Sequence, residues 1–408
     1  MNHKFDTEVD RQDSNSVKWE FIQSSENHLG LEQTNRSFGE NRVLPMWVAD
    51  MDFTSPEPVV DALTARAQHG IFGYAAPTQA FYQSVIHWMK RRHQWEILPE
   101  WICITPGVVP ALNMLVRALT SSGGQVLIQP PVYYPFYGAI ENNGADLVLN
   151  PLIYDNNQYR MDFEDLEIKC RDPKVKMAIL CSPHNPVGRV WTQDELIRFG
   201  EICLNNDIIV VSDEIHGDLI YRDHRFTPFA KINERFSHHS VTCTAPSKTF
   251  NLAGLQTSCI VIPDNALRSK FVKVLQSNGL FGVGTFGVVA VQAAYNHGEE
   301  WLSQLIGYLE GNLQYLENYV AEKIPQLTVI RPEGTYLVWL DCRKLQLDKF
   351  QLRRLMLEEA KVYLDEGFIF GPEGEGFERI NIACSRSILI EALDRIKMAV
   401  GKVTHNKC

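Results

Sequence analysis

The stretch Ser240-Val241-Thr242-Cys243-Thr244-Ala245-Pro246-Ser247-Lys248 leads from a short β-rich run to a lysine among small and hydroxylated residues. Another apolar run, 258–262, follows it. A lysine between two buried strands is poorly placed to be a solvated surface charge, and burial lowers the pKa of a lysine because desolvation disfavours the charged form. A neutral amine can attack a carbonyl, which makes Lys248 a candidate nucleophile. Taken alone, such a lysine is more often an ordinary residue at a strand end.

Further apolar runs bounded by turn residues predict the fold around this stretch. They lie at 126–129, 177–181, 208–211 and 258–262, and helical stretches such as 194–205 stand between several of them. Strands that are apolar on both faces and separated by helices indicate a buried, mainly parallel α/β sheet flanked by helices. Ligands of such sheets bind outside the carboxyl ends of the strands. The polar residues that end these runs are therefore the candidates for function.

The pattern predicts two domains and an arm. Residues 1–45 are polar and weakly periodic, and we expect an N-terminal arm that joins the small domain. Residues 46–290 carry the sheet and would form the large cofactor-binding domain. From about residue 291 a long helical stretch, broken near Gly298, is followed by strand-like runs at 328–330 and 336–340. This pattern is typical of a smaller α+β C-terminal domain, 291–408.

Composition excludes several classes of protein. The chain has 408 residues, of which 45% are hydrophobic, and its formal charge is −10, which argues against a general nucleic-acid binder. No apolar stretch approaches the length of a membrane span, and the N-terminus lacks the apolar core of a signal peptide, so we expect a cytoplasmic protein. The nine cysteines are scattered singly, and no spacing indicates a metal site.

Three strand ends carry the residues that matter for chemistry. The run 208–211 ends in Ser212-Asp213-Glu214-Ile215-His216, the run 178–181 ends in Ser182-Pro183-His184-Asn185-Pro186, and the third end leads to Lys248. At the carboxyl edge of one sheet, Asp213, Asn185 and Lys248 can converge on a single ligand. The strand–glycine–helix order around Gly107 is a pattern that binds anions, because free N–H groups and the positive end of the helix dipole meet there.

Pyridoxal 5′-phosphate (PLP) requires this set of groups. Its aldehyde needs an amine, its ring nitrogen needs a carboxylate, its 3-oxygen needs a neutral donor and its phosphate needs N–H groups. A carboxylate next to the pyridinium would have a lowered pKa, because an opposite charge favours the ionised form. Each residue also has a simpler reading: Asp213 could cap a helix, and Asn185 before proline is a common turn.

At this point the sequence resembles the fold-type I, class I/II aminotransferase superfamily of PLP enzymes. More narrowly it resembles the cystathionine β-lyase (C–S lyase) branch typified by MalY and PatB. The matching motifs run nearly end to end, at 15–19, 46–53, 72–74, 107–110, 185–188, 212–216, 247–248 and 379–381. The resemblance implies the fold of that superfamily, PLP as the cofactor and an L-amino acid as the substrate.

The resemblance also implies roles for individual residues in binding the cofactor. Lys248 would bind the aldehyde and move the Cα proton, Asp213 would pair with the ring nitrogen, and Asn185 would bond the 3-oxygen. Tyr133 would stack on the ring. The remaining cofactor-binding residues would be Val108, Val109 and Ser247 at the phosphate, His216 in a structural rather than catalytic role, and Tyr74 at the phosphate of the neighbouring subunit, which implies a homodimer.

Substrate binding is implied in the same way. Arg379 would clamp the α-carboxylate, a bidentate task suited to a guanidinium. Tyr134 and Ala49 would complete the substrate pocket, although Tyr134 is also a candidate core aromatic. Two departures concern the phosphate: Gln256 and Ala245 stand where related enzymes commonly have an arginine and a serine. The phosphate would then be held by fewer side chains than is usual.

The resulting hypothesis is a PLP-dependent carbon–sulfur β-lyase that acts on an L-cysteine S-conjugate such as L-cystathionine and yields pyruvate and ammonia. Three alternatives stay open: an aminotransferase, a cysteine sulfoxide-conjugate lyase of thiohistidine biosynthesis, and a regulatory binding protein on the same fold. The glycines at 282–287 have the spacing of a dinucleotide-binding motif. That motif follows a strand, whereas a helix-like segment precedes these glycines, so we reject the dinucleotide-binding interpretation. We interpret the segment as a loop near the site or at the dimer contact.

Overall fold

A computed structural model of the chain describes residues 5–23, 31–33, 43–120 and 123–405. The chain divides into two compact units. The first comprises residues 1–54, 304–332 and 336–408, and the second comprises 55–303 with 333–335. The predicted domain borders at 45 and 290 remain a prediction, and the predicted arm lies partly outside the described residues.

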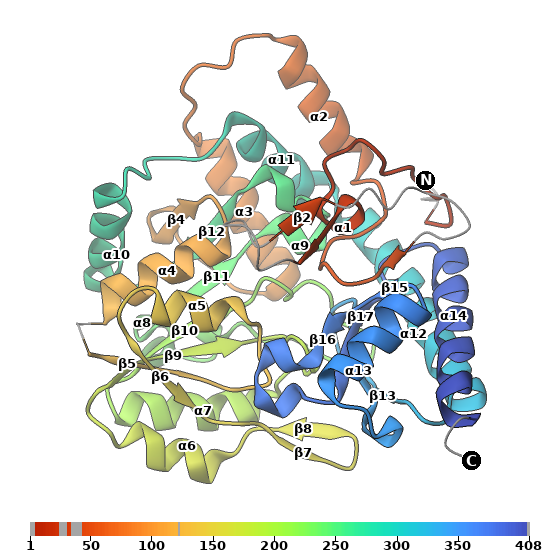
Figure 1. The fold of residues 1–408 in the computed structure, drawn as a ribbon. Coiled ribbons are helices and arrows are strands. Elements are labelled where there is room, and N and C mark those ends of the chain that lie inside the picture. Colours follow the sequence, from red (N-terminus) through yellow and green to blue (C-terminus); the bar gives the residue numbers. More distant parts are fainter. Residues whose placement is uncertain (1–4, 24–30, 34–42, 121–122, 406–408) are drawn as a thin grey trace. The chain divides into compact units, whose positions relative to one another are not determined.

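A seven-stranded sheet forms the centre of the second unit, in the order β4-β12-β11-β10-β9-β5-β6 (Figure 1). Its strands are β4 (Ile102–Thr105), β5 (Gln125–Ile128), β6 (Asp146–Leu149), β9 (Val175–Cys181), β10 (Ile209–Asp213), β11 (Ser240–Thr244) and β12 (Ser258–Val261). Only β12 runs antiparallel to its neighbours β11 and β4, so the predicted mainly parallel sheet is confirmed. A short hairpin, β7 (Ile153–Asp155) with β8 (Gln158–Arg160), also belongs to this unit.

Helices cover both faces of this sheet (Figure 1). On one side α4 packs against β4, β9, β11 and β12 and against two helices, α5 and α10, while α7 packs against β10 from the other side together with α6. The bounds of the helices in this unit are α2 (Glu57–Gln68), α3 (Gln79–His93), α4 (Val108–Leu119), α5 (Pro135–Glu141), α6 (Phe163–Cys170), α7 (Gln193–Asn205), α8 (Glu234–His238), α9 (Pro246–Thr249), α10 (Asn265–Ser277) and α11 (Thr285–His297).

Successive side chains of a strand point to opposite faces of the sheet, and this alternation determines which of them contact α4. Val211, Val241 and Ile179 belong to one continuous apolar cluster with the inner face of α4, and their neighbours two residues on are Asp213, Cys243 and Cys181. Local signals set the helix starts: Thr192 and Glu195 form a capping box at α7. Asp213 thus lies at the carboxyl end of β10, on the face of the sheet that carries the apolar cluster.

The first unit contains a four-stranded antiparallel sheet, in the order β13-β14-β17-β16. These strands are β13 (Thr328–Ile330), β14 (Leu337–Asp341), β16 (Asp365–Glu366) and β17 (Phe377–Asn381). The unit also contains α1 (Val17–Glu20), α13 (Lys349–Arg354), α14 (Arg386–His405) and most of α12 (Glu299–Lys323), and two strand pairs, β1 (Phe21–Gln23) with β2 (Leu31–Gln33) and β3 (Leu44–Pro45) with β15 (Val362–Tyr363).

Part of the predicted N-terminal arm is firmly packed. Lys18 in α1 is buried and lies 2.8 Å from the Asp52 carboxylate, which also accepts a hydrogen bond from the Trp19 ring at 2.8 Å. Arg11 completes the network, 3.1 Å from Asp52 and 3.3 Å from Asp50. A buried charge is tolerated only when it is paired and hydrogen-bonded. The polar composition that indicated an arm therefore reflects, at these positions, a buried ionic network.

Candidate functional site

The carboxyl ends of β9, β10 and β11 lie side by side, with Asp213 on the middle strand. Asp213 is in register with Cys181 of β9 and with Cys243 of β11. The Ser182 N–H donates to the Asp213 carbonyl at 3.0 Å, and the Glu214 N–H donates to the Cys243 carbonyl at 2.8 Å. These bonds hold together the three segments that lead to Asn185, Asp213 and Lys248.

Asn185 follows the end of β9 in a buried turn. Its side chain and backbone are 4% exposed, and its N–H donates to the Cys181 thiol at 3.4 Å. Cys181 lies opposite Asp213 in the sheet, and burial together with the Asp213 charge raises the pKa of its thiol. The turn that carries Asn185 is thus fixed next to Asp213.

Lys248 lies in the single-turn helix α9, which begins directly after β11 and Ala245. Because β11 pairs with β10, Lys248 and Asp213 follow neighbouring strand ends, and the Lys248 charge opposes the effect of burial on the pKa of Asp213. Asp213 itself is 4% exposed, and burial raises its pKa to about 7 against the opposing effects of the Ile215 N–H, at 3.2 Å, and of Lys248. The lowered pKa predicted from the sequence concerns Asp213 with a pyridinium beside it.

This arrangement fits the ring of PLP. A buried carboxylate with one backbone donor gains most from a cationic partner, and a protonated pyridine nitrogen is such a partner. An amine, a carboxylate and an amide are delivered by neighbouring strand ends of one sheet. The residues present therefore suit the amine, nitrogen and 3-oxygen requirements of the cofactor.

The loop after β5 brings Tyr133 to the same edge of the sheet. Tyr133 is partly buried against the core, with its ring 5.7 Å from Phe136 in an edge-on contact and 5.4 Å from Tyr134. His184, in the Asn185 turn, lies 2.9 Å from the Pro131 carbonyl through Nε2. Burial lowers the pKa of His184 to about 4, so this histidine joins the two loops as a neutral group.

The predicted phosphate region lies at the start of α4. Gly107 precedes the helix with φ of 144°, a conformation that L side chains rarely adopt, and a Cβ there would lie 3.3 Å from Pro110. Val108 and Val109 are the first residues of α4, so their N–H groups have no acceptor within the helix. Ser247 lies in α9 beside Lys248 and is partly buried.

His216 and Tyr74 have contrasting surroundings. His216 is buried in the turn after β10, where its carbonyl accepts from the Leu219 N–H at 2.9 Å. Tyr74 is 113% exposed in the loop between α2 and α3. Nearby in the same loop, Phe72 packs on Phe286 with ring centroids 5.7 Å apart. The glycine-rich segment before α11 is a loop that follows helix α10, as predicted.

Arg379 and Ala49 belong to the first unit. Arg379 is 2% exposed, forms an ion pair with Asp365, and donates to the Trp47 carbonyl at 2.8 Å, both through Nη2. The Ala49 carbonyl accepts from the Tyr336 hydroxyl at 2.9 Å. Sequence reasoning did not foresee Asp365, which competes with any carboxylate for Arg379.

Three further polar residues near the site carried no clear sequence signal. Glu214 is buried, and burial raises its pKa to about 8. Asp218 is buried and accepts a hydrogen bond from Thr249, the residue after Lys248, at 2.8 Å. The partners of Asp218, Trp88 and Thr249, lie 130 and 31 residues away along the chain, so no local motif marks it. In the described part of the chain, no helix is long and apolar enough to cross a membrane and no metal-binding group of three or more His, Cys, Asp or Glu occurs.

Known proteins with similar sequences and structures agree on one family. The model of the family "Aminotransferase class I and II" matches residues 41–396. Cystathionine beta-lyase PatB of Bacillus subtilis is 47% identical over 397 residues, covering 97% of this chain and 100% of PatB.

Two solved structures are similar over nearly the whole chain. Cystalysin from Treponema denticola, which contains a pyridoxal 5′-phosphate cofactor, is 37% identical with a TM-score of 0.93, covering 98% of this chain and 100% of cystalysin. The PLP-bound C–S lyase from Staphylococcus hominis is 32% identical with a TM-score of 0.88, covering 98% of each chain. The predicted fold-type I architecture is thereby confirmed. The chain belongs to the class I and II aminotransferase family of PLP-dependent proteins.

Proposed function

We propose that this chain is a PLP-dependent carbon–sulfur β-lyase that cleaves L-cysteine S-conjugates. With L-cystathionine and water as reactants, the products would be L-homocysteine, pyruvate and ammonia. The substrate loses its Cα proton and the thiol from Cβ, and hydrolysis of the remaining three-carbon fragment releases the other two products. No 2-oxo acid is consumed, which separates this reaction from transamination.

The observation that carries the proposal is the meeting of Asn185, Asp213 and Lys248 at one sheet edge. This set supports PLP chemistry on an amino acid. The choice of a C–S bond as the bond that breaks is supported by the 47% identity to a cystathionine β-lyase and by the likeness to a C–S lyase structure.

Each residue would have a distinct task. When bound, PLP accepts the electron pair left on Cα after proton removal. The Lys248 amine would take up that proton, and the buried Asp213 carboxylate would hold a positive charge on the ring nitrogen. The Asn185 amide would donate to the 3-oxygen, Tyr133 would cover the ring, and the N–H groups of Val108 and Val109, with the Ser247 hydroxyl, would hold the phosphate.

We further propose that Arg379 binds the substrate carboxylate and that Tyr134 and Ala49 shape the substrate pocket. A guanidinium can serve two carboxylates when different nitrogens face them. Asp365 would then orient Arg379 rather than block it. Replacing Asp365 by Asn tests this assignment: KM for the amino acid should change while the cofactor absorbance stays constant.

We propose a homodimer in which Tyr74 reaches the phosphate of the neighbouring subunit. Large apolar side chains that are exposed close together often mark an interface. Four such residues occur at Ile71, Phe72, Tyr74 and Phe281, and the last is 82% exposed. Light scattering on the purified chain should give twice the mass of one chain, and a monomeric mass would contradict the proposal.

The function is tested by incubating the cofactor-loaded protein with L-cystathionine and a panel of cysteine S-conjugates, without any 2-oxo acid. We expect stoichiometric pyruvate and free thiol for at least one compound. If none of them yields either product, the lyase proposal is wrong. An aminotransferase, the activity for which the family is named, would instead form a new amino acid only after a 2-oxo acid is added.

A further inference from the structure

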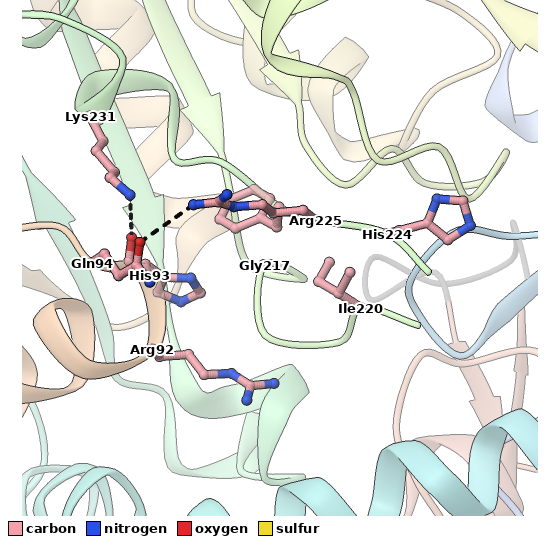
Figure 2. A pocket seen from close by; sticks show the side chains of 9 residues that line it. Arg92, His93, Gln94, Gly217, Ile220, His224, Arg225 and Lys231 are labelled. Carbon is pink, nitrogen blue, oxygen red and sulfur yellow. Dashed lines mark hydrogen bonds between the residues drawn. The ribbon is translucent and has the colours of Figure 1, made fainter. Parts of the chain in front are cut away.

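A surface cavity of about 170 Å³ lies at the end of α3 and is rich in cations (Figure 2). The Lys231 ammonium donates to the His93 carbonyl at 2.9 Å, and the Arg225 guanidinium donates to the Gln94 side chain at 3.4 Å. Both partners belong to the C-terminal end of α3, which carries the negative end of the helix dipole. The cations thus already have a structural task there, and the cavity alone does not indicate an anion ligand.

One residue that lines the cavity, His93, also contacts the buried carboxylate of Asp218. His93 lines the cavity, and its Nε2 lies 2.9 Å from the Asp218 carboxylate. The same carboxylate accepts hydrogen bonds from the Trp88 ring at 3.2 Å and from the Thr249 hydroxyl at 2.8 Å. Arg92 adds a donor to the Asp218 carbonyl at 3.0 Å. Asp218 therefore links three residues of α3, Trp88, Arg92 and His93, to Thr249, the residue that follows Lys248.

The hydrogen bond between Asp218 and Thr249 is buried. Asp218 is 6% exposed and Thr249 is fully buried. A buried carboxylate that loses a hydrogen-bond donor cannot replace that donor with water. Breaking the Asp218–Thr249 hydrogen bond is therefore costly in free energy. The next residue, Phe250, is also fully buried, and its ring packs edge-on against Trp88 at 5.5 Å. Thr249 and Phe250 thus anchor α9 on the side of α3.

The position of Thr249 has a consequence for Lys248. Helix α9 has four residues and hardly any length to resist rotation about its axis. Successive residues of a helix project in directions about 100° apart, so fixing the Thr249 direction also fixes the direction in which Lys248 projects. Asp218 holds Thr249 on the side of α3, so Lys248, one residue earlier in α9, projects in a different direction.

We propose that Asp218 is a positioning residue, which acts through the Thr249 hydroxyl to aim the Lys248 amine at the cofactor. The inference rests on the proposed function for its catalytic consequence, but its geometric content concerns only how Lys248 is held. Asp218 touches neither substrate nor cofactor in this account.

Thr249→Val is the main test, because valine keeps the shape of threonine and removes only the hydroxyl. The loss of one hydrogen bond to a charged group should lower kcat about tenfold. KM should change less than about twofold, since substrate binding is not touched. The pH midpoint of the visible absorbance of the bound cofactor should shift, because the amine that carries the cofactor is no longer held in one direction.

Two further variants make the test specific. Thr249→Ser retains the hydroxyl and should restore both kcat and the absorbance midpoint to near the starting values. Thr120→Val removes a hydroxyl that donates to the Val116 carbonyl at the other end of α4 from Gly107, and it should leave both readouts unchanged. Asp218→Asn should shift the absorbance midpoint in the same direction as Thr249→Val.

The outcomes separate this inference from the proposed function. If Thr249→Val is folded, retains cofactor and keeps the starting kcat and absorbance midpoint, Asp218 does not position Lys248. If the unmodified protein cleaves no sulfur compound but the absorbance midpoint still shifts in Thr249→Val and not in Thr249→Ser, the positioning inference stands and the lyase proposal falls. A purely structural role would lower the melting temperature of Thr249→Val without moving the midpoint, and that result would overturn the inference.

Discussion

Asp213 and Asp218 lie five residues apart in the same segment and are both buried, yet their environments act in opposite directions. At Asp213 burial dominates and raises the pKa to about 7, with one backbone donor and a nearby lysine in opposition. At Asp218 the pKa is lowered although burial acts to raise it, because His93, Arg92 and Thr249 together outweigh desolvation. A buried carboxylate with few donors or cations around it is suited to bind a cationic ligand. A buried carboxylate that already has several such partners is suited to a structural role.

The largest effect is expected from removing the one charged group that lowers the pKa of Asp213. Lys248→Ala should abolish covalent attachment of the cofactor and reduce lyase activity by at least about 1,000-fold. Without the neighbouring charge, the pKa of Asp213 should rise further. Activity assays and the visible absorbance of the protein measure both losses. Retained turnover would mean that another residue carries the amine chemistry.

Neutralising the two aspartates should separate function from stability. Asp213→Asn should cut activity at least about 100-fold, while the free energy of unfolding stays within about 1 kcal/mol, because the variant removes a charge that burial disfavours. Asp218→Ala should lower the free energy of unfolding by about 3 kcal/mol, because it leaves buried donors on Trp88, Thr249 and His93 unmatched.

Urea unfolding of both variants with the cofactor removed provides the comparison. Equal destabilisation of the two variants would contradict the distinction between a ligand site and an anchor. An unchanged activity in Asp213→Asn would contradict the assignment of this residue to the cofactor.

The raised pKa of Asp213 should determine the direction in which the free energy of unfolding changes with pH. An aspartate has a pKa of about 3.9 in an unfolded chain, whereas that of Asp213 is about 7 in the folded protein. Between these values the folded state binds more protons than the unfolded state, so its stability falls as pH rises from about 4 to 7. The slope from this group is at most about 1.4 kcal/mol per pH unit. Measured on the protein with the cofactor removed, Asp213→Asn should flatten the curve in this window, and an unaltered slope would contradict the raised pKa.

Sequence alone predicted the elements whose signals are local. The bounds of β11 agree with the sequence pattern, and the predicted break at Gly298 separates α11 from α12. The convergence of Asn185, Asp213 and Lys248 followed from the rule that parallel strands end at one edge. The antiparallel direction of β12 could not be predicted in this way, because its apolar run looks the same in either direction.

The sequence also could not predict hydrogen bonds and ion pairs between residues that lie far apart along the chain. Asp218 depends on Trp88 and Thr249, which lie 130 residues before it and 31 residues after it. Arg379 was predicted to bind the substrate carboxylate, but its ion pair with Asp365 depends on the pairing of β16 with β17.

The smallest effect is expected at Glu214, the third buried carboxyl in the segment. Burial raises its pKa to about 8, so it is mostly protonated at pH 7, and one oxygen accepts from the Ser212 hydroxyl and the Phe229 N–H, each at 2.8 Å. Glutamine offers the same acceptor without the charge. Glu214→Gln should therefore change the free energy of unfolding by less than about 1 kcal/mol in urea titrations at pH 7. A loss of more than about 2 kcal/mol would indicate an ionised Glu214.

The central claim is that Lys248 carries the cofactor at the edge of the sheet beside Asp213 and Asn185. Borohydride reduction of the PLP-loaded protein, followed by digestion and mass spectrometry, locates the lysine that holds the cofactor. The account predicts a single modified peptide that contains Lys248. A modification on another lysine, such as Lys231 at the cation-rich cavity, or no modification at all, would contradict it.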